Sequence, residues 1–144
     1  MHRELILTEE PIDERAWVAS RAGGVTHGAV VTFSGVVRGS EHGQPIAGLE
    51  YTAFEAMARH QFGLLLDRVA ARWPVESVRL VHRMGPVSAG DVSLWVEVLA
   101  PHRAEAFAAC QMLIDEMKRV VPIWKRVMER GNGGSAGRSN QSEP

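Results

Sequence analysis

The hydrophobic and polar positions of the chain follow two kinds of pattern, and each predicts a different element. Short runs of β-branched and aliphatic residues are typical of strands, whereas an apolar residue every three or four positions is typical of a helix with one buried face. Helices are predicted at 11–22, from Glu55 to about Arg72, and at 102–121. Strands are predicted at 4–8, 28–38, 49–54, 77–85, 91–100 and 123–128.

Capping and breaking residues mark the ends of the predicted helices. Pro11 stands near the start of the first helix, and Gly23-Gly24 follows it. Thr52 and Glu55 have the spacing of a capping box for the second helix. Pro122 ends the third helix, because proline cannot continue one. The second helix has one apolar face, made by Ala58, Phe62, Leu65, Leu66 and Val69.

The order of elements favours the α+β class. Helices are mixed with strands joined by short turns, so we expect a largely antiparallel sheet rather than a Rossmann-type sheet. Segment 38–48 is predicted as a loop, and 86–90 as the turn between two strands. The second of these strands, 91–100, has a clean alternation of apolar and other residues, with Val92, Leu94, Val96 and Val98 on one face. One domain is expected over 1–130, and the polar segment 131–144 is expected to be disordered.

Composition and charge exclude several classes of protein. The net charge of −1, from 16 Lys+Arg and 17 Asp+Glu, disfavours a protein that coats nucleic acid. Cys110 is the only cysteine, which excludes an intrachain disulfide and a multi-cysteine zinc site, and the six histidines lack metal-binding spacing. The first residues lack the long apolar segment of a signal peptide, and the sequence contains no run of about 18 apolar residues, so we expect no membrane span and a cytoplasmic location.

The third predicted helix carries a lysine at the edge of its apolar arc. At about 100° per residue, Lys118 lies next to that arc, and Arg103 at the helix start projects to the same side. A lysine held against apolar groups loses hydration, which favours its neutral form and suits it to proton transfer. In the alternative, Lys118 lays its methylenes on the core and keeps its ammonium in water. The arc comprises Ala106, Phe107, Cys110, Leu113, Ile114, Met117 and Val121.

A second lysine lies in the last predicted strand. Side chains alternate along a strand, so Lys125 points to the face opposite Trp124 and Arg126 and can reach a cleft while the tryptophan is buried. The alternative is an edge-strand lysine that discourages aggregation.

Other candidates lie at the ends of elements. His102 and Arg103 follow Pro101 at a strand-to-helix junction, where free N–H groups could bind a phosphate or carboxylate, although both residues could simply flank the helix. Arg38 ends a strand at a glycine-bearing loop. It could contact an anionic ligand there, or it could be a solvated charge at the strand end. His82 is expected to be a core histidine, and Cys110 a buried thiol rather than a nucleophile.

Taken together, these segments resemble the large, catalytic subunits of the molybdopterin synthase family. The resemblance covers about residues 28–126 in the family's order and spacing. It implies an α/β hammerhead-type fold, with a largely antiparallel sheet packed by helices. The matching stretches are GAVVTFSGVVR (28–38), LEYTAF (49–54), RWP (72–74), VHRMG (81–85), AGD (89–91), APHRAEAF (100–107) and MK…PIWKR (117–126).

The resemblance also implies a set of site residues. Lys118 and Lys125 would be the catalytic lysines. Some relatives supply a further basic residue from their C-terminal segment to the neighbouring subunit, for which Arg130 and Arg138 are the candidates. The implied substrate-binding residues are Val36, Val37, Arg38, His102, Arg103 and Arg126.

The reaction implied by the resemblance is a sulfurtransfer. Cyclic pyranopterin monophosphate becomes molybdopterin, with two sulfurs delivered in succession from the thiocarboxylated C-terminus of a small ubiquitin-like subunit ending in Gly-Gly. The thiocarboxylate is the nucleophile, so the large subunit needs no cysteine of its own. Two large subunits form a homodimer within a heterotetramer, and no metal, nucleotide or other cofactor takes part. The alternative is a non-catalytic scaffold or pseudo-enzyme that docks a ubiquitin-like sulfur carrier, and the presence of both lysines, Arg38 and the His-Arg pair favours the enzyme.

Overall fold

Eight strands and three helices form within residues 1–131, the part of the chain that the computed structural model describes. In chain order they are β1 (His2–Thr8), α1 (Glu14–Ala19), β2 (Ala29–Val36), β3 (Ser40–Glu41), β4 (Gln44–Ala53), α2 (Glu55–Arg72), β5 (Ser77–Arg83), β6 (Gly85–Ser88), β7 (Val92–Ala100), α3 (Arg103–Val120) and β8 (Ile123–Glu129).

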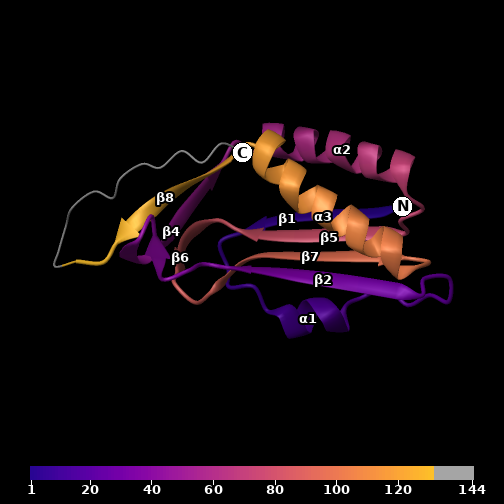
Figure 1. Cartoon of the computed structure of the whole chain (residues 1–144), viewed down its shortest axis with the longest axis horizontal. Helices are drawn as coiled ribbons and strands as arrows, with labels where there is room; N and C mark the ends of the chain where they lie inside the picture. The colour runs from indigo at the N-terminus through magenta and orange to yellow at the C-terminus, as the bar shows by residue number, and fades with distance from the viewer. Residues whose placement is uncertain (132–144) are drawn as a thin grey trace.

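The strands form two sheets. In the first sheet the order is β1-β5-β7-β2, with β1 parallel to β5 and the other neighbours antiparallel. The second sheet is built on β4, which pairs antiparallel with β3, β6 and β8. Helices α2 and α3 cover one face of the first sheet, α1 lies on the other, and the second sheet extends from one end (Figure 1). The α+β class and the largely antiparallel pairing are confirmed.

The main core lies between the first sheet and helices α2 and α3. All five residues of the predicted apolar face of α2 are buried there, next to Leu113 and Met117 of α3. Burial of these side chains is the main favourable term that holds the helices on the sheet. A smaller core under the second sheet consists of Val37, Ile46, Leu49 and Val87.

The first helix is shorter than predicted. It begins after Asp13, whose carboxylate accepts the backbone N–H of Ala16 at 3.2 Å, because an aspartate satisfies the free donors of a helix start better than the preceding Pro11. Its end is held by Arg79, which donates to the Trp17 carbonyl at 2.7 Å and to the Ser20 hydroxyl at 2.9 Å.

The capping box predicted for α2 is wrong. Phe54 is the N-cap, and it makes no side-chain capping bond. Thr52 belongs to β4, where it pairs with Trp124, so strand pairing removes it from the helix start. Glu55 pairs instead with Arg59, one turn along the helix.

Two segments predicted as loop and turn contain strands. Within 38–48, β3 and the first residues of β4 form a hairpin, with His42 and Gly43 at positive φ. Within 86–90, most residues belong to β6, which pairs with β4 rather than with its neighbours in sequence. Gly85 has φ of 77°, a backbone conformation that glycine adopts without strain, and it redirects the chain from the first sheet to the second.

The C-terminal segment lies almost entirely outside the part of the chain that the structure describes. The segment predicted to be disordered lies, from residue 132 onward, outside the described residues, and so does Arg138. None of the helices in residues 1–131 combines the length and the apolar character needed to cross a membrane.

Candidate functional site

Three candidate cations come from elements that meet at the end of the molecule where the second sheet begins. Lys118 is in the last turn of α3, and Lys125 is on β8, which follows that helix. Arg38 comes two residues after β2, and the backbone of Val37 beside it is bonded to Asp91 at 3.0 Å and to Gly90 at 2.8 Å. The connection between β6 and β7 therefore holds the backbone next to Arg38.

Lys125 lies on the inner face of the second sheet. Its register partner on β4 is Tyr51, and directly paired residues share one face of a sheet. The Lys125 Nζ atom is 3.5 Å from Oε1 of Glu41, which comes from β3. The Lys125 side chain is 26% exposed and the Glu41 side chain 12%, so the pair is largely shielded from solvent.

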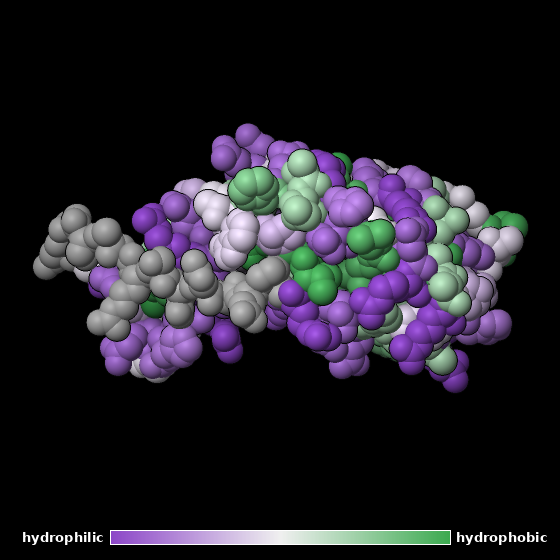
Figure 2. All heavy atoms as spheres, turned by 90° about the horizontal axis from the view of Figure 1, so that it is seen from above, coloured by the Kyte–Doolittle hydropathy of each residue, from purple (hydrophilic) through white to green (hydrophobic). Residues whose placement is uncertain are grey.

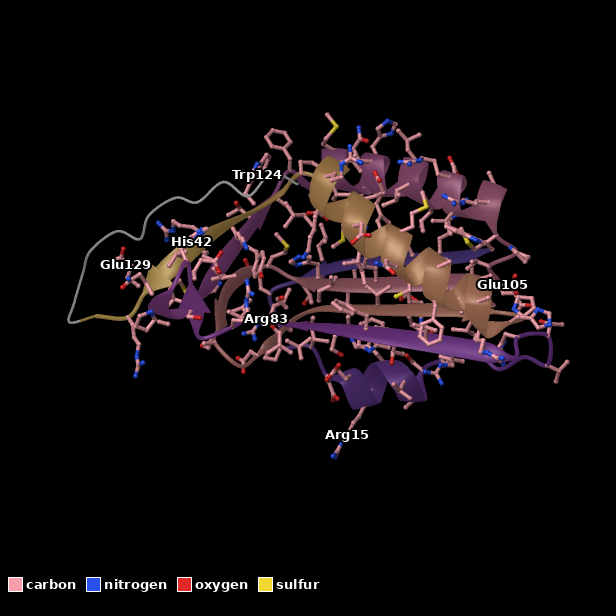
Figure 3. All side chains as sticks on the ribbon, viewed as in Figure 1. Arg15, His42, Arg83, Glu105, Trp124 and Glu129 are labelled. Atoms are coloured by element: carbon pink, nitrogen blue, oxygen red, sulfur yellow. The ribbon has the colours of Figure 1, made fainter. Side chains whose placement is uncertain are left out.

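The residues on either side of Lys125 point to the opposite face, as predicted. Arg126 pairs with Glu50 at 3.1 Å, and the Trp124 ring packs edge-on against Phe54 with centroids 6.5 Å apart. Figure 3 shows Trp124 on the outer side of the junction between α3 and β8. Arg126 is thus separated from Lys125 by the sheet itself.

Lys118 is exposed to solvent. It follows Met117, which belongs to the core, so the position agrees with the alternative in which the ammonium stays in water. The two valines implied by the resemblance differ from each other, since Val36 is 51% exposed and Val37 is buried.

His102 and Arg103 lie at the other end of the first sheet. The register pairs Ala29 with Ala100 at this end and Val36 with Val92 at the end near Arg38. At about 3.3 Å per residue, the eight residues of β2 extend about 23 Å between the two ends. In Figure 3, Glu105 marks the end of the first sheet where α3 begins, and Arg83 lies toward the opposite end. One chain alone does not bring the His-Arg pair together with Arg38 and the lysines.

The start of α3 is also less cationic than its sequence indicates. Glu105 Oε1 accepts the backbone N–H of His102 at 2.8 Å and lies 3.4 Å from its Nδ1. Both His102 and Arg103 are exposed, so a ligand there would meet an open helix start with one carboxylate beside it.

A polar cluster that the sequence pattern did not indicate lies between the two sheets. Tyr51 of β4 packs edge-on against His82 of β5, with ring centroids 4.9 Å apart. Burial raises the pKa of Tyr51, the charge of Glu41 adds to this, and a hydrogen bond with Ser93 opposes it. Burial lowers the pKa of His82, against a bond to the Arg83 carbonyl at 2.9 Å. Both side chains are therefore held in their neutral forms.

Two hollows in the described surface are lined mainly by other residues, although Tyr51 borders the first of them. One of about 550 Å³ is lined by Glu9, Glu50 and Glu55 among others, and three carboxylates do not suit an anionic ligand. Another, of about 400 Å³, lies between β2 and α3, where Phe33, Phe107 and Cys110 line it. Figure 2 shows the face that carries α2 and α3, where hydrophobic side chains are scattered among hydrophilic ones. Neither hollow is lined by the two candidate lysines or by any of the six implied substrate-binding residues.

Cys110 has the properties expected of a buried thiol. It is 4% exposed, and burial raises its pKa to about 11. At neutral pH it is therefore a thiol, not the thiolate that a nucleophile requires.

Comparison with known proteins identifies the family. Residues 7–120 match the model of the family described as MoaE protein. The chain belongs to the MoaE family. A MoaE relative from a Nostoc species, named molybdopterin synthase catalytic subunit, is 44% identical over 101 residues, which are 69% of this chain and 61% of the relative. The chain spans between 51% and 61% of the length of several such relatives.

Solved structures of MoaE proteins share the fold. The crystal structure of molybdopterin synthase from Staphylococcus aureus has a TM-score of 0.80 and 31% identity, covering 94% of this chain and 96% of that one. A Helicobacter pylori structure, described as a complex of subunits 1 and 2 of the molybdopterin-converting factor, has a TM-score of 0.71. It is 22% identical and covers 87% of this chain and 84% of that one, which supports the MoaE fold alone.

Proposed function

We propose that this chain is the catalytic subunit of a molybdopterin synthase. It would convert cyclic pyranopterin monophosphate to molybdopterin, taking two sulfurs in succession from the thiocarboxylated C-terminus of a small ubiquitin-like subunit that ends in Gly-Gly. The observation that carries the proposal is that a chain of the MoaE family has Lys118, Lys125 and Arg38 on elements that meet at one end of the fold. We expect the reaction to take place in the cytoplasm.

Each of these cations has a role that its position supports. The substrate is a cyclic phosphate, and the attacking thiocarboxylate is also an anion, so both reactants need positive charge nearby. Arg38 can offer a planar fork of donors to the phosphate, and charge-assisted bonds of this kind contribute about 1.5–3 kcal/mol each. Lys125 is shielded from solvent and suits orientation of the thiocarboxylate, while Lys118 is accessible for proton transfer.

A complete site would need two copies of the chain. His102 and Arg103 lie about 23 Å from the Arg38 end of β2 in their own chain, which is too far for one small ligand to bridge. In a two-fold dimer each contact occurs twice, so the His-Arg end of either copy can reach the lysine end of the other and form two identical sites. The homodimer within a heterotetramer is therefore part of the proposal.

A small ubiquitin-like partner is also part of the proposal. Support comes from the relatives named catalytic subunit and from a protein of the same fold solved as a complex of two subunits. In a scaffold, the alternative function, the partner would dock without reaction. A largely shielded ammonium is expected of an enzyme more than of a scaffold, since burial of charge costs stability.

Reconstitution tests the proposal. The purified chain is mixed with a thiocarboxylated ubiquitin-like partner and cyclic pyranopterin monophosphate, and dithiolene product is measured by mass spectrometry. We expect product to depend on the thiocarboxylate, with none formed from the partner's ordinary carboxylate form. Binding of the partner without any product would favour the scaffold.

A further inference from the structure

Glu41 is a largely buried carboxylate at the candidate site, and neither the motifs nor the proposed chemistry accounts for it. We propose that Glu41 is a positioning residue that holds the Lys125 ammonium in place for the anionic reactants. The inference rests on the proposed function, because it concerns the same site.

The environment of Glu41 explains why the carboxylate needs a cation. It comes from β3, a strand of two residues whose register pairs Glu41 with Gln44 across a tight hairpin. With 12% of its side chain exposed, the carboxylate has lost most of its hydration, and buried charges are stable only when paired. The partner is Lys125, at 3.5 Å from a strand 84 residues away in sequence.

The ion pair restricts a side chain that would otherwise be mobile. A lysine has four flexible methylenes, and ordering them costs conformational entropy. Holding the ammonium in advance removes this cost from the reaction, which is the benefit of positioning. The ammonium has three donors and Glu41 accepts one, so two remain for an incoming carboxylate or phosphate.

Tyr51 is the residue paired with Lys125 in the sheet. It pairs directly with Lys125 across β4 and β8 and lies on the same face. Its raised pKa, caused first by burial and then by the Glu41 charge, keeps the phenol neutral. Lys125 thus has a neutral ring as its sheet neighbour and a carboxylate as its ion-pair partner.

The neighbouring ion pair shows that such an arrangement is not simply a property of the strand. Arg126 and Glu50 are paired at 3.1 Å on the opposite face, but their side chains are 45% and 34% exposed. An exposed pair of that kind contributes little to stability or position. The shielding of Glu41 and Lys125 is specific to the inner face.

The test is Glu41→Gln in the reconstituted complex, with the thiocarboxylated partner and cyclic pyranopterin monophosphate. The variant keeps the shape of the side chain and removes its charge. We expect kcat to fall about tenfold, with the KM for the pterin and the Kd for the partner within about twofold of wild type. Glu41→Asp, which keeps the carboxylate on a shorter arm, should recover part of the loss. Asp67→Asn, which removes the carboxylate of an exposed pair with Arg3, is the matched control and should match wild type.

Two further readouts separate positioning from folding and from the wider proposal. In a Lys125→Ala background, Glu41→Gln should have no additional effect on kcat, because its action passes through the lysine. An equal loss in both backgrounds, or wild-type kcat for Glu41→Gln, overturns the inference while leaving the function intact. A wild-type complex that makes no dithiolene refutes the proposed function, and the inference with it. Thermal unfolding shows whether Glu41→Gln folds. If it does not, the test uses Glu41→Asp, for which a reduced kcat with an unchanged KM supports the positioning role of Glu41.

Discussion

Lys125 and Arg126 are adjacent in sequence, yet strand alternation gives them different surroundings. Lys125 faces Glu41 and Tyr51 beneath the second sheet, whereas Arg126 faces Glu50 on the outside. The distinction matters because a shielded ammonium interacts strongly with a nearby anion, while an exposed guanidinium is screened by water and salt. At the scale of single residues, we therefore propose that the inward Lys125, and not Arg126, takes part in the chemistry.

Substitution of the lysines tests that assignment. Lys118→Ala and Lys125→Ala should each abolish most dithiolene formation while the protein stays folded. Lys→Arg should rescue poorly, because arginine remains charged near neutral pH and cannot exchange protons. Arg119→Ala is the matched control, since Arg119 is a neighbouring cation on α3 that is 73% exposed. Wild-type turnover by both alanine variants would exclude the proposed roles.

Cys110 offers an independent test of where the sulfur comes from. Its pKa of about 11 leaves almost no thiolate at neutral pH, so we expect slow alkylation of the folded protein. Cys110→Ser should retain sulfur transfer, with a stability loss of about 1–2 kcal/mol from the disturbed packing. Alkylation rates and dithiolene yield are the measurements. A folded Cys110→Ser protein that transfers no sulfur would show that the sulfur carrier was misassigned.

At the scale of elements, α1 is attached to the first sheet by a buried ion pair. Arg79 donates to both carboxylate oxygens of Glu97, at 2.9 and 3.1 Å, and Arg21 donates to Glu97 at 2.7 Å. Glu97 is completely buried, and Arg79 also lies against the rings of Trp17 and Trp95. Apolar and polar residues alternate in the two strands that carry Arg79 and Glu97, as they do in an ordinary pair of strands. The sequence pattern therefore did not predict this network.

Removal of one partner from this network should be costly. Glu97→Gln leaves the Arg79 charge buried without its counter-charge, and we expect a loss of about 3–5 kcal/mol in the free energy of unfolding. Urea denaturation measures it. The exposed pair is the comparison, because Asp67→Asn should cost about 1 kcal/mol or less. Equal losses for the two variants would mean that burial does not strengthen the Arg79–Glu97 pair.

The elements that were predicted well are those whose signal is local and long. α2 extends over 18 residues, and its five apolar positions repeat at helical spacing, so sequence alone identified the buried face. The errors concern short segments whose state depends on distant partners. β6 has four residues and resembles a turn, and it is a strand only because β4 lies beside it. Thr52 likewise has capping chemistry, but its pairing with Trp124 determines its state.

At the scale of the whole molecule, the same limit applies to the candidate site. The resemblance supplied the residues, but it could not show that β2 separates Arg38 from the His-Arg pair within one chain. That separation follows from strand direction and helix length, which a list of motifs does not contain. Glu41 was missed for a related reason, because a two-residue strand in a polar loop gives no sign that its carboxylate becomes buried.

The junction between the two sheets should make the stability of the whole molecule depend on pH. His82 of the first sheet is buried against Tyr51 of the second, and burial lowers the pKa of His82 below its ordinary value. The unfolded chain therefore takes up a proton more readily than the folded one below about pH 6.5, so stability is lost as pH falls through that value. Urea unfolding at several pH values should show a shallower dependence for His82→Asn than for wild type. Parallel curves would contradict the assignment to His82.

We propose that each catalytic site is built from two copies of the chain, and a mixture of two inactive variants tests this proposal. Lys125→Ala and Arg103→Ala are each purified, mixed in equal amounts under conditions that exchange subunits, and assayed for dithiolene with the thiocarboxylated partner and cyclic pterin. If the site takes its lysines from one copy and its His-Arg pair from the other, half of the dimers are mixed and each of these has one intact site. We expect recovery to about a quarter of wild-type activity. Activity no higher than that of the separate variants would contradict it.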